Sequence, residues 1–137
     1  MDQFDAHPAR DAARASMRAV EAGDRAGWLA LFAPDAIVED PIGPSMFDPD
    51  GRGHRGADAI AAFYDNVISS GRVQFAIRES YAGGNECANV GTITTTLPDG
   101  SRAIVEGVYT YRLDDAGKIT ALRAYWEPER MTFAPAG

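Results

Sequence analysis

The chain has 137 residues, which is enough for one hydrophobic core and too few for two domains, so residues 1–137 are expected to form one domain. With 13 Lys and Arg against 20 Asp and Glu, the net charge is -7, which argues against nucleic acids and anionic membranes as partners. One cysteine excludes an intramolecular disulfide, no Cys/His cluster has metal-ligand spacing, and neither a signal peptide nor a membrane span is recognisable, so the cytoplasm is the expected location.

Sequence patterns predict helices in the first half of the chain and strands in the second. Pro8 suits the first turn of a helix, Gly23 suits its end, and Asp24 suits the N-cap of a second helix. The predicted helices are 8–22, 24–32 and 57–69, and the predicted strands are 36–40, 73–82, 89–97, 103–113 and 118–126. This order predicts an α+β fold in which three helices cover one face of a curved antiparallel sheet and enclose an apolar pocket.

Residues 38–43, Val-Glu-Asp-Pro-Ile-Gly, place a carboxylate directly after an apolar segment. Pro41 removes a backbone donor and favours extended geometry at Asp40, so the strand is expected to end there. A carboxylate at the mouth of an apolar cavity is a candidate proton-transfer group, and the alternative is a solvated aspartate in a turn. In the following loop, Met46 and Phe47 either cover the pocket or simply pack the loop down.

Period-two alternation separates the strand at 103–113 into two faces. The face expected to line the cavity carries Val105, Gly107, Tyr109, Tyr111 and Leu113, with Gly107 leaving space for a ligand. Further lining residues are expected at Val20, Phe63, Val90 and Thr92. The outer face is expected to carry Glu106, Val108, Thr110, Arg112, Arg123 and Tyr125, a mixture that suits a two-fold interface.

Two aromatic residues of this predicted cavity carry polar groups. The indole N–H of Trp126 needs a partner when it is buried, and the carboxylate of Asp40 would hold it while being held in one rotamer. The phenol of Tyr109 can donate to a developing oxyanion. The alternative for both is a core aromatic residue with its polar tip at the rim.

The chain resembles the bacterial Δ5-3-ketosteroid isomerases over about residues 8–130. The segments that carry the resemblance, in the order and approximate spacing of that family, are Gly23-Asp24, residues 38–43, Ala61-Ala62-Phe63-Tyr64 and Ala124-Tyr125-Trp126. The chain is also similar to actinobacterial steroid-binding members of this cone-shaped superfamily, which includes nuclear transport factor 2 and polyketide cyclases.

The resemblance implies cofactor-free proton transfer, in which a carboxylate moves a proton from C4 to C6 of a 3-oxo-Δ5-steroid and two donors stabilise the dienolate. Ketosteroid isomerase is itself a standard case of such pKa tuning. By this resemblance the base falls on Asp40, and the family's oxyanion tyrosine and protonated aspartate fall on Ser16 and Tyr109. Both donors have therefore changed type. Pocket aromatic positions of the family fall on Trp126, Tyr64 and Phe32.

The sequence therefore predicts a steroid Δ5-Δ4 isomerase with Asp40 as general base, no cofactor, and assembly into a homodimer through the outer sheet face. The alternative is a non-catalytic protein that binds steroids or other flat apolar molecules. An epoxide hydrolase of this shape would need an Asp-Arg-Asp set around a water, which the cavity-facing positions lack. A protein-binding module would have no use for an enclosed carboxylate.

Overall fold

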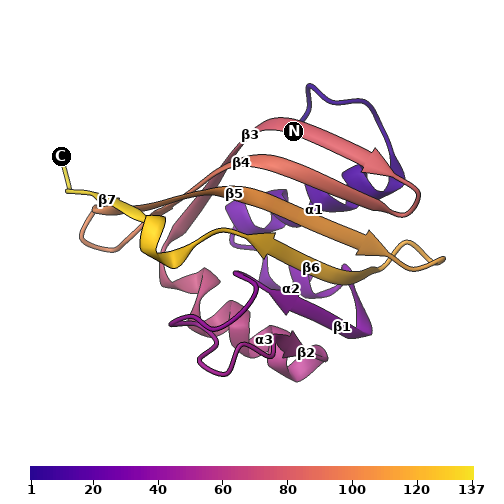
Figure 1. The fold of residues 1–137 in the computed structure, drawn as a ribbon, viewed down its shortest axis with the longest axis horizontal. Helices are drawn as coiled ribbons and strands as arrows, with labels where there is room; N and C mark the ends of the chain where they lie inside the picture. The colour runs from indigo at the N-terminus through magenta and orange to yellow at the C-terminus, as the bar shows by residue number, and fades with distance from the viewer.

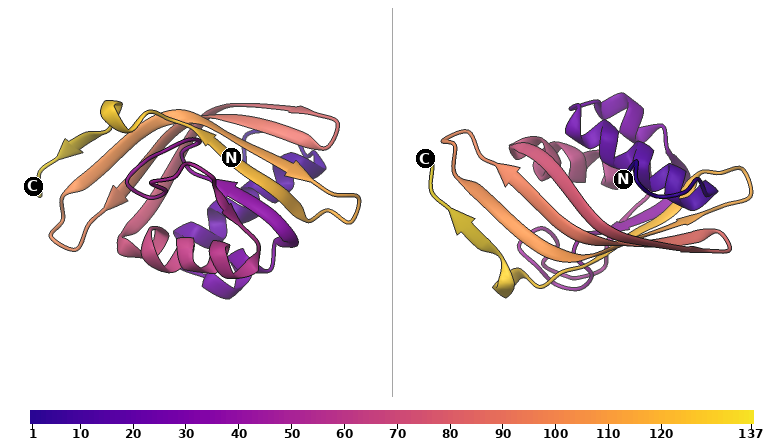
Figure 2. Two further views of the ribbon diagram at one scale, coloured as in Figure 1. Left: turned by 60° about the horizontal axis from the view of Figure 1, so that its bottom comes forward. Right: turned by 90° about the horizontal axis from the view of Figure 1, so that it is seen from above.

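The computed structural model describes residues 1–137 as a strongly curved sheet with the helices packed on its concave face (Figures 1 and 2). The helices are α1 (Pro8–Glu21), α2 (Arg25–Leu29) and α3 (Ala57–Asn66), with short 3-10 turns η1 (Ile68–Ser70) and η2 (Pro128–Arg130). The strands are β1 (Phe32–Glu39), β2 (His54–Arg55), β3 (Arg72–Gly83), β4 (Glu86–Thr96), β5 (Arg102–Leu113), β6 (Ile119–Tyr125) and β7 (Thr132–Ala134).

The sheet has the order β2-β1-β6-β5-β4-β3, and β7 pairs with β5 beyond this path. All pairings are antiparallel except that of β1 with β6, which is parallel. The predicted α+β fold with a curved, largely antiparallel sheet and three helices is confirmed. The short strands β2 and β7 were not predicted, because two or three residues are too few to show a two-residue alternation.

Helix α1 begins and ends much as its sequence predicts. The His7 imidazole accepts a hydrogen bond from the Ala9 N–H at 3.1 Å, Pro8 occupies the first turn, and Gly23 follows the helix with a φ of 68°. Ala9 and Ala13 are fully buried, and their small side chains let the helix lie close to the sheet. The helix thereby turns its remaining buried positions, including Ser16, toward the concave face.

Helix α2 is shorter than the sequence predicts. Asp24 caps it as expected, accepting a hydrogen bond from the Gly27 N–H at 2.9 Å. The helix ends at Leu29, however, and Phe32 already begins β1. Pro34 bars a helix only from residue 33 onward. The earlier end comes from the pairing of residues 31 and 32 with Ile119 of β6.

Neighbouring backbone comes very close to two paired glycines, Gly91 and Gly107. A Cβ atom on Gly91 would lie 2.3 Å from the Ala76 carbonyl oxygen, beside a bulge in β3. A Cβ atom on Gly107 would lie 2.4 Å from the Tyr125 carbonyl oxygen. Any larger residue would therefore push the neighbouring strands apart at these two positions.

A hydrophobic cluster of 21 buried residues joins the helices to the concave face. Trp28 lies among them with 1% of its surface exposed, and its ring contacts Phe32 and Tyr64 at centroid distances of 4.6 and 5.5 Å. None of the helices combines the length and the apolar character that crossing a bilayer requires.

Candidate active site

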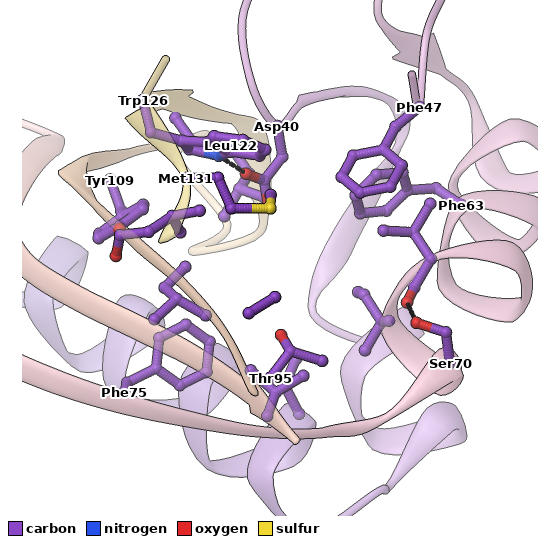
Figure 3. A pocket seen from close by; sticks show the side chains of 18 of the residues that line it. Asp40, Phe47, Phe63, Ser70, Phe75, Thr95, Tyr109, Leu122, Trp126 and Met131 are labelled. Carbon is purple, nitrogen blue, oxygen red and sulfur yellow. Dashed lines mark hydrogen bonds between the residues drawn. The ribbon is translucent and has the colours of Figure 1, made fainter. Parts of the chain in front are cut away.

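Between the helices and the concave face lies a cavity of about 330 Å³, within the size range of small-molecule sites (Figure 3). Of the 24 residues that line it, 20 are hydrophobic. The four others are Ser16, Asp40, Ser70 and Thr95. Asp40 is therefore the one carboxylate in an apolar enclosure that holds no lysine, arginine or histidine.

Asp40 and Trp126 meet at this cavity from the ends of two adjacent strands (Figure 3). The expected hydrogen bond is present: the Trp126 Nε1–H donates to Asp40 Oδ1 at 2.6 Å. A backbone bond from the Ile42 N–H to the Ala124 carbonyl, 3.0 Å long, fixes the two chain segments beside each other. One carboxylate oxygen is thus occupied by the indole, while the other carries no bond to the protein.

The pKa of Asp40 is raised from its ordinary value, chiefly because burial of the carboxyl group penalises the charged form. The hydrogen bond from Trp126 and the charge of nearby His54 act in the opposite direction and lower it. A carboxylate with a raised pKa is a stronger base than a solvated one. The alternative of a solvated turn aspartate does not describe Asp40, because its half-buried side chain lines the cavity and is bonded to Trp126.

Gly107 leaves room for Trp126 and not for a ligand. It does not line the cavity, and a Cβ atom there would lie 2.9 Å from the Cβ of Trp126. The space that the sequence suggested would hold a ligand is instead needed for the close approach of β6. The glycine therefore helps to set the position of the indole that holds Asp40.

Tyr109 lines the cavity but its hydroxyl is already used. It is 3% exposed and donates toward the backbone carbonyls of Gly91 and Val105, at 3.2 and 3.4 Å. Burial, reinforced by the charge of Asp40, raises the pKa of this phenol, so it stays protonated at neutral pH. To donate to a ligand, Tyr109 would have to give up its backbone partners.

Ser16 is buried in α1 and lines the cavity together with two aromatic partners. Its Oγ accepts a hydrogen bond from Trp28 Nε1–H at 3.0 Å and lies 3.4 Å from the Tyr111 hydroxyl oxygen. This cluster was not predicted as a unit. The alternation of β5 indicated that Tyr111 faces the cavity, but nothing in the sequence links Trp28 to Ser16.

Other predicted lining residues divide into two groups. Val20 and Phe63 line the cavity as expected. Tyr64 and Phe32 do not: both pack against Trp28, behind the cavity wall. The prediction that these two residues line the cavity is wrong for one reason: Trp28 occupies the space between α2, α3 and β1 and separates their rings from the cavity.

The assignment of Val90 and Thr92 to the cavity is wrong. In the β4–β5 register, Ile93 pairs with the cavity residue Val105, so its face of β4 turns inward. Thr92 pairs with Glu106 and donates a hydrogen bond to its carboxylate on the outer face. Alternation separates the two faces of a strand but does not say which face is inside, and the register supplies that information.

The loop after Asp40 and the end of the chain complete the cavity. Met46 and Phe47 both line it, and the Phe47 ring lies edge-on to Trp126 at a centroid distance of 6.3 Å. Both residues of the loop therefore form part of the cavity wall. Met131 and Phe133, around β7, line the cavity too and were not predicted.

A curved sheet, three helices and an enclosed apolar cavity with one hydrogen-bonded carboxylate define a protein of the cone-shaped α+β class. Sequence comparison agrees with this class: the SnoaL-like domain matches residues 13–122. The chain belongs to the SnoaL-like, nuclear transport factor 2-like family and is ketosteroid isomerase-like within it.

Three relatives illustrate the similarity. A steroid Δ-isomerase of Nocardioides simplex is 33% identical over 118 residues, which cover 86% of this chain and 89% of that protein. The crystal structure of a Δ5-3-ketosteroid isomerase from Mycobacterium sp. is 46% identical, with a TM-score of 0.90 over 94% of this chain and 100% of that chain. The crystal structure of RV0760c from Mycobacterium tuberculosis in complex with estradiol-17β-hemisuccinate is 40% identical, with a TM-score of 0.88 over 93% of this chain and 99% of that chain.

Proposed function

We propose that the protein is a cofactor-independent steroid Δ5-Δ4 isomerase with Asp40 as its general base. The observation that carries the proposal is the isolation of Asp40: one carboxylate, with a raised pKa and one free oxygen, in an otherwise apolar cavity. Such a site suits a flat apolar substrate that carries an acidic C–H group. The isomerase relatives and the steroid-bound relative support a steroid as that substrate.

The proposed reaction is an internal proton transfer that needs no co-reactant. The Asp40 carboxylate removes a proton from C4, and the C–H electron pair moves toward the C3 carbonyl oxygen to give a dienolate. The carboxylic acid then returns the same proton to C6, and the double bond moves into conjugation with the carbonyl. The apolar lining excludes water, which keeps the proton on Asp40 between the two steps.

Substitution of Trp126 by Phe is expected to move the acid limb of the pH–rate profile to higher pH. The indole N–H lowers the pKa of Asp40, so its removal raises that pKa further and leaves less carboxylate at any acidic pH. The measurement is kcat/KM against pH for both proteins, because this ratio reports ionisation of the free enzyme. A limb that stays in place or moves to lower pH would contradict the role given to Trp126.

A binding protein without catalysis is the second candidate, and one observation favours it. The Tyr109 hydroxyl, one of the two expected oxyanion donors, is turned to backbone carbonyls. Loss of an oxyanion donor typically costs about 10²–10³ in rate. Turnover separates the two candidates, since both place a steroid in the same cavity.

The proposed assembly is a homodimer through the convex face of the sheet. No helix covers this face, and it carries the half-exposed ring of Tyr125 beside the ion pair between Arg123 and Glu39. Exposed aromatic residues rimmed by charged groups are typical of such interfaces. Sedimentation velocity at micromolar concentration is expected to give twice the mass of the chain, and a monomer alone would contradict the dimer.

A further inference from the structure

The cluster of Trp28, Ser16 and Tyr111 holds more hydrogen-bond donors than its contacts use. The indole N–H, the serine hydroxyl and the phenol hydroxyl supply three protons, but only two contacts join the groups, at 3.0 and 3.4 Å. No other protein acceptor is bonded to any of the three side chains. One hydroxyl proton of this buried cluster is therefore left for an acceptor in the cavity, which both Ser16 and Tyr111 line.

Trp28 fixes one of the contacts of the Ser16 oxygen. An indole N–H can only donate, so it occupies one lone pair of the Ser16 oxygen permanently. Hydroxyl protons rotate freely, and the Ser16 hydroxyl can point to the phenol oxygen of Tyr111 without any heavy atom moving. Without a ligand the Tyr111 hydroxyl donates to Ser16. When an acceptor enters the cavity, the reversed order, Trp28 to Ser16 to Tyr111, frees the phenol proton, which is the more acidic of the two hydroxyl protons, for that acceptor.

The other polar groups of the cavity are less suitable as hydrogen-bond donors to a substrate on which Asp40 acts. The Tyr109 hydroxyl is directed to backbone carbonyls, and the Ser70 hydroxyl donates to the Val67 carbonyl at 2.6 Å. Thr95 lies across the cavity from Asp40 and Trp126 (Figure 3). The Tyr111 hydroxyl, by contrast, makes no hydrogen bond to a backbone carbonyl, and its one contact is with the Ser16 hydroxyl. Burial raises the pKa of this phenol and keeps it protonated.

We infer that Tyr111, held by Ser16 and Trp28, is the donor to the carbonyl oxygen of the substrate; this rests on the proposed isomerase function. As Asp40 removes the proton from carbon, negative charge develops on that oxygen and the hydrogen bond from Tyr111 strengthens. The phenol keeps its proton throughout, so the only proton transferred is the one carried by Asp40. The family's donor on α1 is thereby replaced from β5, while Ser16 at the helix position becomes its support.

The first experiment compares three variants that each remove only a hydroxyl group. With a 3-oxo-Δ5-steroid as substrate, Tyr111→Phe is expected to lower kcat by roughly 10²–10³. Tyr109→Phe is expected to lower it less than about tenfold, because its hydroxyl serves the backbone. Tyr81→Phe, on the exposed surface of β3, is the matched control and is expected to leave kcat unchanged. A Tyr111→Phe rate within about threefold of wild type would overturn the inference.

A binding experiment separates failure of the inference from failure of the proposed function. Estradiol carries a 3-hydroxyl oxygen that can accept from Tyr111, and 3-deoxyestradiol lacks it. The wild type is expected to bind estradiol more tightly, and Tyr111→Phe is expected to lose that preference while binding 3-deoxyestradiol as well as the wild type does. If the wild type shows no turnover, this comparison still tests Tyr111. A preference that survives in Tyr111→Phe contradicts the donor role even in an active enzyme.

Discussion

Asp40→Asn is expected to lower kcat for isomerisation by about 10²–10⁴, the usual contribution of a positioned general base. The amide cannot accept the proton, although its oxygen can still accept the hydrogen bond from Trp126. Steroid affinity should change little, because the apolar lining is untouched. The measurement is kcat and steroid Kd for both proteins. Asp35→Asn, an exposed position on the same strand, is the matched control and should behave as the wild type.

The same substitution is expected to raise the melting temperature at neutral pH, which excludes unfolding as the cause of lost activity. A raised pKa means that the folded state binds the Asp40 proton more tightly than the unfolded state does. Stability therefore falls as pH rises from the ordinary aspartate pKa to the raised one, and stays lower above it. Asparagine removes this cost. A variant with a lower melting temperature at pH 7 would contradict the assigned burial of the carboxylate.

Trp28→Ala is expected to cost about 3–5 kcal/mol of unfolding free energy. The ring is 1% exposed and contacts Phe32 and Tyr64, so its removal leaves a large hole between α2, α3 and β1. It also leaves Ser16 without its indole donor. Since the free energy of unfolding of such domains is about 5–15 kcal/mol, this substitution is expected to remove a large part of it. Urea denaturation followed by circular dichroism measures the change.

Trp28→Phe separates the two contributions of this tryptophan. Phenylalanine retains an aromatic ring against Phe32 and Tyr64 but cannot donate to Ser16. Its expected cost is about 1–3 kcal/mol, the range for a buried polar group that loses its partner. Equal losses for Phe and Ala would show that the hydrogen bond, and not the packing of the ring, accounts for the stability.

Much of the fold was predictable because its signals are local. Asp24 caps α2, and Pro41 ends β1 beside Asp40, as their chemistry requires. The early end of α2 and the strand β7 were missed, because both depend on contacts with distant segments. Phe32 belongs to β1 because it pairs with Ile119 of β6. No local sequence pattern predicts a pairing partner so far along the chain.

The candidate site was predictable where one buried group requires a partner. Trp126 needs an acceptor and Asp40 needs a donor, which was enough to expect their hydrogen bond. The assignment of Val90 and Thr92 to the cavity failed because only the register between β4 and β5 fixes which face is inside. The contact of Ser16 with Tyr111 joins residues 95 positions apart and could not be inferred from spacing.

The most direct test of the proposed isomerase is the ultraviolet absorbance of the conjugated Δ4 enone after the purified protein is mixed with a 3-oxo-Δ5-steroid. We expect the absorbance to grow in proportion to protein concentration for the wild type and to remain at the uncatalysed rate for Asp40→Asn. A flat trace for the wild type, with the steroid bound as judged by quenching of tryptophan fluorescence, would contradict catalysis and leave a steroid-binding protein.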